Sequence, residues 1–235
     1  MGTVKTKGIV IAENNTSDFD KMLTMLTPGL GKISCAAKGA RRPKSTLMAG
    51  SQFLCFGDYI LYKGHDAYNI NTCETIEVFY NIRTDLDKLQ QASEVTKMIR
   101  EVTTENQNSY RILQLYLNTL YTISETDKNY QMVFSIFRLR LLSLLGFAPT
   151  VKHCTNCKTT EGINYFSIKQ NGLLCTNCGK LDSGAIKICD STRLAIQYSI
   201  LANAKKLYSI NISEEGNNEL SLIAKLYVKD KLQDI

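Results

Sequence analysis

The sequence contains no tryptophan and only two histidines among its 235 residues. Histidine is the side chain that most often transfers protons near neutral pH, so the sequence offers few residues for histidine-based acid–base catalysis. No stretch approaches the roughly 18 consecutive apolar residues of a membrane helix, and the N-terminal residues lack the apolar core of a secretion signal. We therefore expect a protein of the reducing cytoplasm, with no membrane partner.

The composition is that of a globular chain with a mild basic excess. Hydrophobic residues make up 44% and charged residues 21% of the sequence, the formal net charge is +6 and the pI is about 8.8. This balance is compatible with a polyanionic partner, and the length allows more than one domain. Four of the eight cysteines stand among apolar neighbours, and we predict that they are small buried hydrophobes: Cys35, Cys55, Cys73 and Cys189.

The other four cysteines form two Cys-x-x-Cys pairs, Cys154 with Cys157 and Cys175 with Cys178. This spacing is typical of a tetrahedral zinc site, because each pair on a tight turn aims two thiolates at one point. The intervening segment, which contains Gly172, is long enough to run out and return as a hairpin. Four thiolates leave no open coordination position, so the pattern predicts one structural zinc ion. Two disulfides and free buried thiols are the alternatives.

The first 80 residues are rich in strand patterns. We expect strands over residues 4–12, 19–26, 32–37, 53–62 and 76–80, with turn signals between them. About five strands without a helix signal of comparable strength predict a small closed barrel over residues 1–80, and the OB-fold is the obvious candidate.

Residues 81–235 are predicted to form a helical domain into which a zinc knuckle, residues 151–182, is inserted. Apolar residues recur at helical spacing from Asp85 onwards, at Leu86, Leu89, Ala92, Val95, Ile99 and Val102. Thr104 and Gln107 fit a capping box for the next helix. Residues 130–145 are apolar on nearly every face, which predicts a buried central helix. Two later helices are marked by Leu194, Tyr198 and Leu201, and by Leu220, Ile223 and Tyr227. The expected fold class is α+β with two domains.

No acidic residue stands between Asp20 and Asp58. The interval contains six cations, four of them within residues 38–45: Lys21, Lys32, Lys38, Arg41, Arg42 and Lys44. Gly39 lets the strand turn out and Pro43 stiffens the loop. We predict a rigid basic projection that binds phosphates. A solvated charge cluster is the alternative.

Other residues leave the chemistry open or argue against catalysis. The barrel aromatics can stack unpaired bases or fill the core, and their alternation does not tell which: Phe53, Phe56, Tyr59, Tyr62 and Tyr68. The segment Gly29–Lys32 lacks the first glycine and the final Ser or Thr of a phosphate-binding loop. His153 stands beside Cys154 without the His-x-Glu element of a zinc deaminase. We expect no enzymatic activity.

Two motifs resemble the RecO family of bacterial DNA repair proteins. One runs from Gly31-Lys32-Ile33-Ser34 through the basic residues 38–45, and the other is Leu144–Pro149 leading into the two cysteine pairs. The order of the parts also matches, and the resemblance spans nearly the whole chain. One departure is Lys158, where such knuckles often carry glycine after the second cysteine.

The resemblance implies a recombination mediator without catalytic activity. Such proteins bind single- and double-stranded DNA, anneal complementary strands, and work with RecR and often RecF. They help load RecA onto DNA coated by the single-stranded-DNA-binding protein SSB, and some contact the SSB C-terminal tail. The basic residues supply a physical route, because they can hold phosphates without reading sequence, and we predict a DNA site at Lys32, Lys38, Arg41, Arg42 and Lys44. The expected location is the cytoplasm, at the nucleoid.

Two other classes compete with this interpretation. One is a zinc-stapled scaffold that binds only proteins, for which the basic loop is incidental. The other is a zinc-ribbon regulator that reads one duplex sequence, with Asn156 and Asn177 of the knuckles as its slender basis. Failure to bind DNA at low salt would favour the scaffold, and a strong preference for one duplex would favour the regulator.

Overall fold

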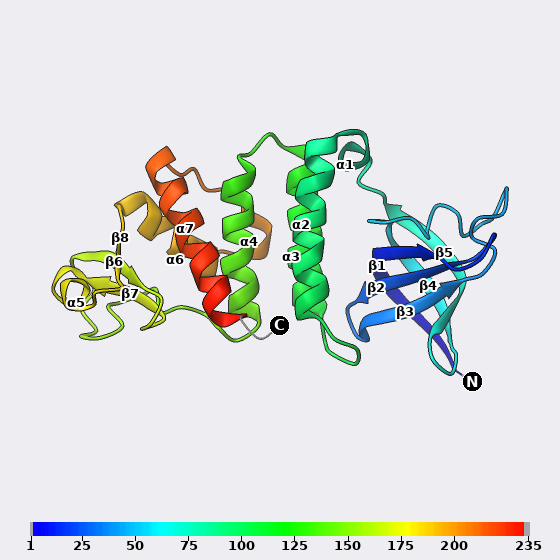
Figure 1. Cartoon of the computed structure of the whole chain (residues 1–235), viewed down its shortest axis with the longest axis horizontal. Coiled ribbons are helices and arrows are strands. Elements are labelled where there is room, and N and C mark those ends of the chain that lie inside the picture. Colours follow the sequence, from blue (N-terminus) through cyan, green and yellow to red (C-terminus); the bar gives the residue numbers. More distant parts are fainter. Residues whose placement is uncertain (1, 233–235) are drawn as a thin grey trace. The chain divides into compact units, whose positions relative to one another are not determined.

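The computed structural model describes residues 2–232 (Figure 1). The chain divides into two compact units, and the boundary in the sequence lies between Ser124 and Glu125. The first unit contains a barrel followed by helices α1 (Tyr80–Thr84), α2 (Leu86–Val102) and α3 (Tyr110–Glu125). The boundary expected after residue 80 separates the barrel from helices within this first unit, and it stays a prediction.

Five strands close the barrel in the order β1-β2-β3-β5-β4, with β4 paired back onto β1. Their bounds are β1 (Thr3–Asn15), β2 (Lys21–Thr27), β3 (Gly31–Ala37), β4 (Phe56–Lys63) and β5 (Tyr68–Glu77). Neighbouring strands are antiparallel, except that β3 runs parallel to β5. This is the OB arrangement, so the predicted fold class is confirmed.

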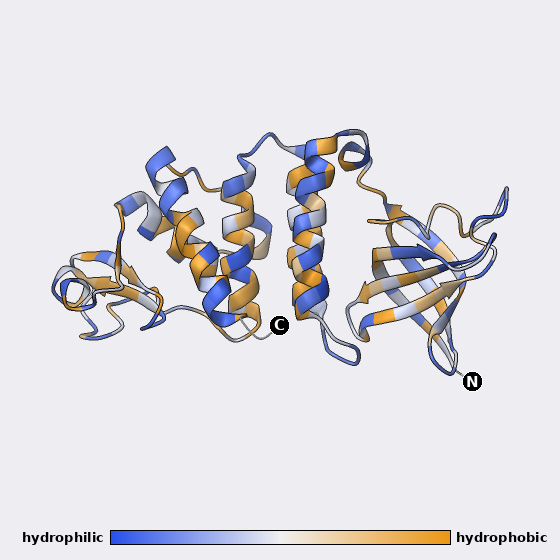
Figure 2. Cartoon of the chain, in the orientation of Figure 1, coloured by the Kyte–Doolittle hydropathy of each residue, from blue (hydrophilic) through white to orange (hydrophobic). Residues whose placement is uncertain are grey.

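The barrel interior is filled by the side chains that alternate inward along each strand. Figure 2 shows this alternation of hydrophobic and hydrophilic residues along the strands. The buried cluster contains Leu23, Met25, Ile33, Cys35 and Leu61. Because every second residue points inward, the remaining residues of β2 and β3 lie on the outer face of the barrel.

The end of the barrel differs from the strand expected over residues 76–80. β5 starts earlier, at Tyr68, and ends at Glu77, and α1 begins at Tyr80. Between them, Phe79 adopts a left-handed backbone with φ of 50° while its side chain is buried. The aromatic residues that predicted a strand therefore belong partly to the turn that leaves the barrel.

Helix α2 follows the expected helical pattern with one exception, and the expected capping box differs from the prediction. Asp85 accepts a hydrogen bond from the Lys88 amide and caps α2, but Leu86 is 80% exposed and does not belong to the buried stripe. The Gln107 side chain accepts hydrogen bonds from both the amide and the hydroxyl of Thr104. The helix after this box starts only at Tyr110, so the box closes a turn instead of capping α3.

The turn after α2 is joined to the barrel through Gly31. The Lys32 amide donates to the Thr104 carbonyl, and the Asn106 amide donates to the Leu30 carbonyl. Gly31 has φ of 72°, and a side chain there would meet the Thr104 oxygen at 2.1 Å. Only glycine allows this close approach between the barrel and the turn.

The second unit is built around α4 (Tyr130–Leu144), which packs against α6 (Asp190–Leu201) and α7 (Glu214–Lys231). The predicted buried central helix is therefore confirmed, and its chain leaves the helix at Gly146 with φ of 95°. The expected buried residues of α7, Leu220, Ile223 and Tyr227, are buried.

The helix expected around Leu194, Tyr198 and Leu201 is present as α6, but these residues do not form its buried face. Leu194 and Leu201 are about half exposed, and mostly smaller side chains face the core together with one isoleucine: Thr192, Ala195, Ile196 and Ser199. Because α6 packs closely on two helices, small residues fit its buried face, and hydrophobicity alone did not identify that face.

Between α4 and α6 the chain forms the knuckle module. The module contains a three-stranded sheet in the order β7-β6-β8 and one short helix, α5, between β7 and β8. The bounds are β6 (Ile163–Ser167), β7 (Gly172–Cys175), α5 (Thr176–Leu181) and β8 (Ile186–Lys187). The hairpin expected between the cysteine pairs is the β6–β7 pair. A 3-10 turn, η1 (Ala204–Lys206), joins α6 to α7. Across the described residues, no helix combines the length and apolar character needed to cross a membrane.

Candidate metal centre and nucleic-acid interface

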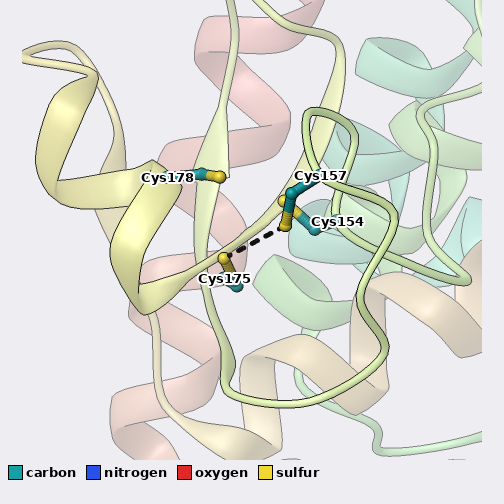
Figure 3. A group of neighbouring side chains, drawn as sticks. All are labelled: Cys154, Cys157, Cys175 and Cys178. Carbon is teal, nitrogen blue, oxygen red and sulfur yellow. Dashed lines mark hydrogen bonds between the residues drawn. The ribbon is translucent and has the colours of Figure 1, made fainter.

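The four knuckle cysteines meet at one point of the second unit. Their sulfur atoms all lie within 4.8 Å of one another, and the Sγ atoms of Cys157 and Cys175 are 3.6 Å apart (Figure 3). A zinc ion that binds four thiolates at about 2.3 Å holds them roughly 3.8 Å apart. Donor type, number and spacing therefore fit one tetrahedral ion, and Cys154 and Cys178 complete the set.

Each half of the centre is supplied by a different local structure. Cys154 and Cys157 lie in a turn in which the Lys158 amide donates to the Cys154 carbonyl. Cys175 ends β7 and Cys178 lies in the first turn of α5. The β6–β7 hairpin returns the chain so that the two pairs face each other.

Backbone amides favour the thiolate forms in this cluster. Burial acts to raise the pKa of Cys154, but the amides of Cys157, Cys175 and Asn156 together bring it to about 6. The Cys178 amide lowers the pKa of Cys175. Burial, with the neighbouring sulfurs, raises the pKa of Cys178 to about 12. A cluster that stabilises some thiolates and resists further negative charge suits a dication, which compensates all four.

The residues that follow the second and the fourth cysteine, Lys158 and Gly179, are each under a conformational or steric constraint. Lys158, the departure from the usual glycine, has φ of 66°, the left-handed region that glycine adopts freely. Gly179 after the fourth cysteine serves another purpose, because a Cβ there would lie 2.3 Å from the Tyr165 ring. Glycine is needed at this position to let an aromatic ring pack on the helix, not to make a turn.

The predicted basic projection forms part of a turn-rich segment, residues 38–55, between β3 and β4. The side chains of all four of its cations are exposed, and within residues 2–232 none of them forms an ion pair: Lys38, Arg41, Arg42 and Lys44. Gly39 has φ of 69°, as expected for the residue that turns the chain out of β3. Positive charge is thus presented to solvent at one end of the barrel.

This basic loop is held by the β1–β2 turn, residues 16–20. The Gly39 amide donates to Asp20 at 2.7 Å, and the Arg41 guanidinium donates to the Ser17 carbonyl at 2.8 Å. The Arg41 amide also donates to the Phe19 carbonyl at 3.0 Å. Hydrogen bonding by the Gly39 amide lowers the pKa of Asp20, helped by Ser17 and by the loop cations. The carboxylate is therefore ionised and orders the loop.

Lys32 lies at the opposite end of β3 from the basic loop. Its Nζ donates to the Arg100 carbonyl in the last turn of α2, at 2.6 Å. There a groove of about 590 Å³ runs between the outer face of β2–β3 and α2, and its cations are Lys32, Lys97 and Arg100, with Glu101 beside them. Lys32 is thus separated from the other four predicted DNA-binding residues, which the structure brings together.

The aromatic residues of the barrel divide between core and surface. Tyr59 is fully buried, with its hydroxyl donating to the Gly50 carbonyl, and Tyr68 is also buried. Tyr62 is 44% exposed. Sequence reasoning overlooked Phe19, an exposed aromatic beside the basic loop, because it is the first residue of the strand expected over residues 19–26. The preceding Ser17-Asp18 pair is the signal that it belongs to a turn.

The fold and the cysteine centre define a class: an OB-barrel protein whose second, helical unit carries a four-cysteine metal-type knuckle. The model of the "Recombination protein O N terminal" domain matches residues 1–79, and that of the "Recombination protein O C terminal" domain matches residues 83–234. The chain belongs to the RecO family.

Full-length relatives agree with this assignment. The chain is 42% identical over 234 residues to the DNA repair protein RecO of Acetivibrio thermocellus, covering 99% of this chain and 93% of the relative. It is 31% identical to that of Alkaliphilus metalliredigens, over 96% of this chain and 92% of the relative. For Bacillus subtilis the identity is 28%, with 96% and 88% covered. Family membership supports a role in DNA repair and recombination through DNA binding.

Proposed function

We propose that this chain is a recombination mediator that binds single- and double-stranded DNA, anneals complementary strands and, with RecR and in some settings RecF, helps load RecA onto SSB-coated DNA. Contact with the SSB C-terminal tail belongs to the same proposal. The protein acts at the nucleoid in the cytoplasm and catalyses no reaction. One observation carries the DNA part: the exposed cations of the basic loop, which form no ion pair among the described residues, lie on an OB barrel in a RecO-family chain.

The loop geometry supports a sequence-independent grip on phosphates. Arg41 and Arg42 present planar forks, and Lys38 and Lys44 present point charges, all on a loop ordered by Asp20. Contacts to phosphate position a nucleic acid without reading its bases. Neutralising phosphates on two strands at once lowers their mutual repulsion, which favours pairing.

We assign one structural zinc ion to the four cysteines. When bound, it supplies four metal–thiolate bonds that join the segment after α4 to the start of α5, and no open coordination position for chemistry. The regulator alternative loses one of its two residues, because the Asn156 side-chain amide donates to Cys178 Sγ at 3.5 Å. Asn156 therefore serves the cysteine centre.

The test is annealing of two complementary labelled oligonucleotides across a salt series. The native protein should accelerate annealing, and changing Lys38, Arg41, Arg42 and Lys44 to Ala should abolish the acceleration and make the salt dependence shallower. The matched control removes the same charge from exposed lysines of the second unit: Lys205, Lys206, Lys225 and Lys229. Equal losses in both variants would show that only net charge matters. No DNA binding by zinc-loaded native protein would favour the scaffold alternative.

A further inference from the structure

The turn between β1 and β2 holds an aromatic ring in an unusual setting. Phe19 is 47% exposed, although a phenylalanine normally stabilises a fold by burying its ring in the core. Its ring faces Arg42 of the basic loop, whose guanidinium carbon lies 5.1 Å from the ring centroid. The core of the barrel therefore does not explain this side chain, and its neighbour is a predicted phosphate-binding residue.

The backbone around Phe19 is fixed before any ligand arrives. Both the Phe19 and Asp20 amides donate to the Ser17 hydroxyl, and the Thr16 amide donates to the Asp20 carbonyl. The Phe19 carbonyl accepts the Arg41 amide. The ring is thus carried by a preorganised turn, which lowers the entropic cost of using it for binding.

The place of Phe19 in the fold also points to a nucleic acid. The β1–β2 connection is one of the two loops through which OB barrels contact oligonucleotides. Aromatic side chains next to cationic grooves bind single strands by stacking on bases, and this stacking tolerates any sequence. In a duplex the bases are stacked on one another, so a single ring has no free base to take.

We propose that Phe19 is a base-stacking residue that gives the basic loop a preference for single-stranded over double-stranded DNA. The loop cations hold the phosphates of either a single strand or a duplex, and the Phe19 ring, flanked by Arg42, receives one unpaired base of the single strand. The inference rests on the proposed function and adds to it a residue that distinguishes the two kinds of DNA.

The absence of tryptophan makes a direct test possible. A Phe19→Trp variant carries the only tryptophan of the chain. An oligothymidylate should quench its fluorescence, whereas an abasic strand of equal length should bind, by anisotropy of an end label, without quenching. A Tyr110→Trp variant is the matched control, because Tyr110 is 59% exposed and follows the turn that contacts the other end of β2, through Ser109 and Pro28. Its fluorescence should not change.

Affinity measurements provide an independent readout. Phe19→Ala should weaken single-strand binding about 5- to 140-fold, the range expected for one stacked base, and leave duplex binding within about twofold. If Phe19 serves only to position Arg42, Phe19→Ala and Arg42→Ala will weaken both kinds of DNA equally, and the inference is wrong. It is equally wrong if bound oligothymidylate and abasic strand quench alike or not at all.

The two levels of proposal fail in different ways. If native protein binds single strands and the four-alanine loop variant does not, while Phe19→Ala binds like the native protein, only the stacking role falls. If native protein binds no DNA at low salt, the proposed function itself falls.

Discussion

The cysteine centre and the basic loop are both irregular segments that carry functional side chains, but they are built on opposite plans. In the centre, four side chains converge until their sulfurs lie within 4.8 Å of one another. In the loop, four cations are exposed to solvent, and the ordering contacts come from the neighbouring β1–β2 turn, one of them to the Arg41 side chain. Side chains that bind one ion recur at a characteristic spacing in the sequence. The exposed cations of the loop are recognisable only as a local enrichment in basic residues.

The difference extends to what holds each segment. In the centre, the same atoms provide function and stability, because the cysteine sulfurs that would bind the ion are also the atoms that join its two halves. In the loop, ordering and function are largely on different atoms, because Asp20 and the Phe19 carbonyl hold the backbone amides of Gly39 and Arg41. Of the four cations, Arg41 also takes part in the ordering, since its guanidinium donates to the Ser17 carbonyl. Changes at the functional residues should therefore unfold the centre and leave the loop folded.

The largest effect should come from Cys175→Ser. Structural zinc contributes apparent free energies of about 10–16 kcal/mol in small zinc-finger peptides, so loss of one ligand should remove the ion and lower the melting temperature of the second unit by at least about 10 °C. Metal analysis and circular dichroism melts, with and without chelator, measure both. Cys73→Ser, a change in β5 outside the centre, should keep the zinc content. Native protein that contains no zinc, together with a silent Cys175→Ser change, would contradict the assignment.

A smaller loss is expected for Gly179→Ala in α5. The added methyl would lie 2.3 Å from the Tyr165 ring, and overpacking of this kind costs about 1–3 kcal/mol. Urea denaturation should show this decrease in the free energy of unfolding. Gly29→Ala is the control, because a methyl there meets nothing within 4 Å and should change stability little. Equal stability of the Gly179→Ala variant and the native protein would mean that the ring moves aside freely.

Lys158→Gly should produce a gain. Its φ of 66° is costly for lysine and free for glycine, but the change also removes the hydrogen bond from Lys158 Nζ to the Thr155 carbonyl. We expect a net increase in the free energy of unfolding of up to about 1 kcal/mol, with unchanged zinc stoichiometry. Lys158→Ala keeps the strain and should not gain. A gain in both variants would place the cause in the charge, not in the backbone.

The smallest effect should be local to the basic loop. The lowered pKa of Asp20 means that its hydrogen bond contributes at pH values above the ordinary carboxyl pKa and is lost as the pH falls through the lowered value. The Gly39 amide resonance should follow this titration by NMR, with a midpoint below that of an unperturbed aspartate. In Asp20→Asn the titration should disappear while the melting temperature stays nearly unchanged. A Gly39 resonance that titrates in this variant would assign the proton to another group.

Much of the fold could be predicted because its signals are local. Alternating strands gave the barrel, the continuous apolar run of residues 130–145 gave α4, and the paired cysteines gave the composition of the centre. The errors fell where packing decides against hydrophobicity, as with the exposed Leu86 and Leu194 and the buried Thr192. The true start of β5 at Tyr68 was missed because only Tyr68 and Ile70 of this strand are buried, and most of its other residues are polar and exposed.

The sequence by itself determined which chemical groups are present and, for the cysteines, that they belong together, because ligands of one ion must recur at restricted spacings. Only the tertiary structure decided which cations share a surface. Lys32 is six residues from Lys38, yet β3 is an extended strand that places them at opposite ends of the barrel. The structure likewise brought Phe19 to Arg42, since two loops distant in sequence meet only when the barrel closes.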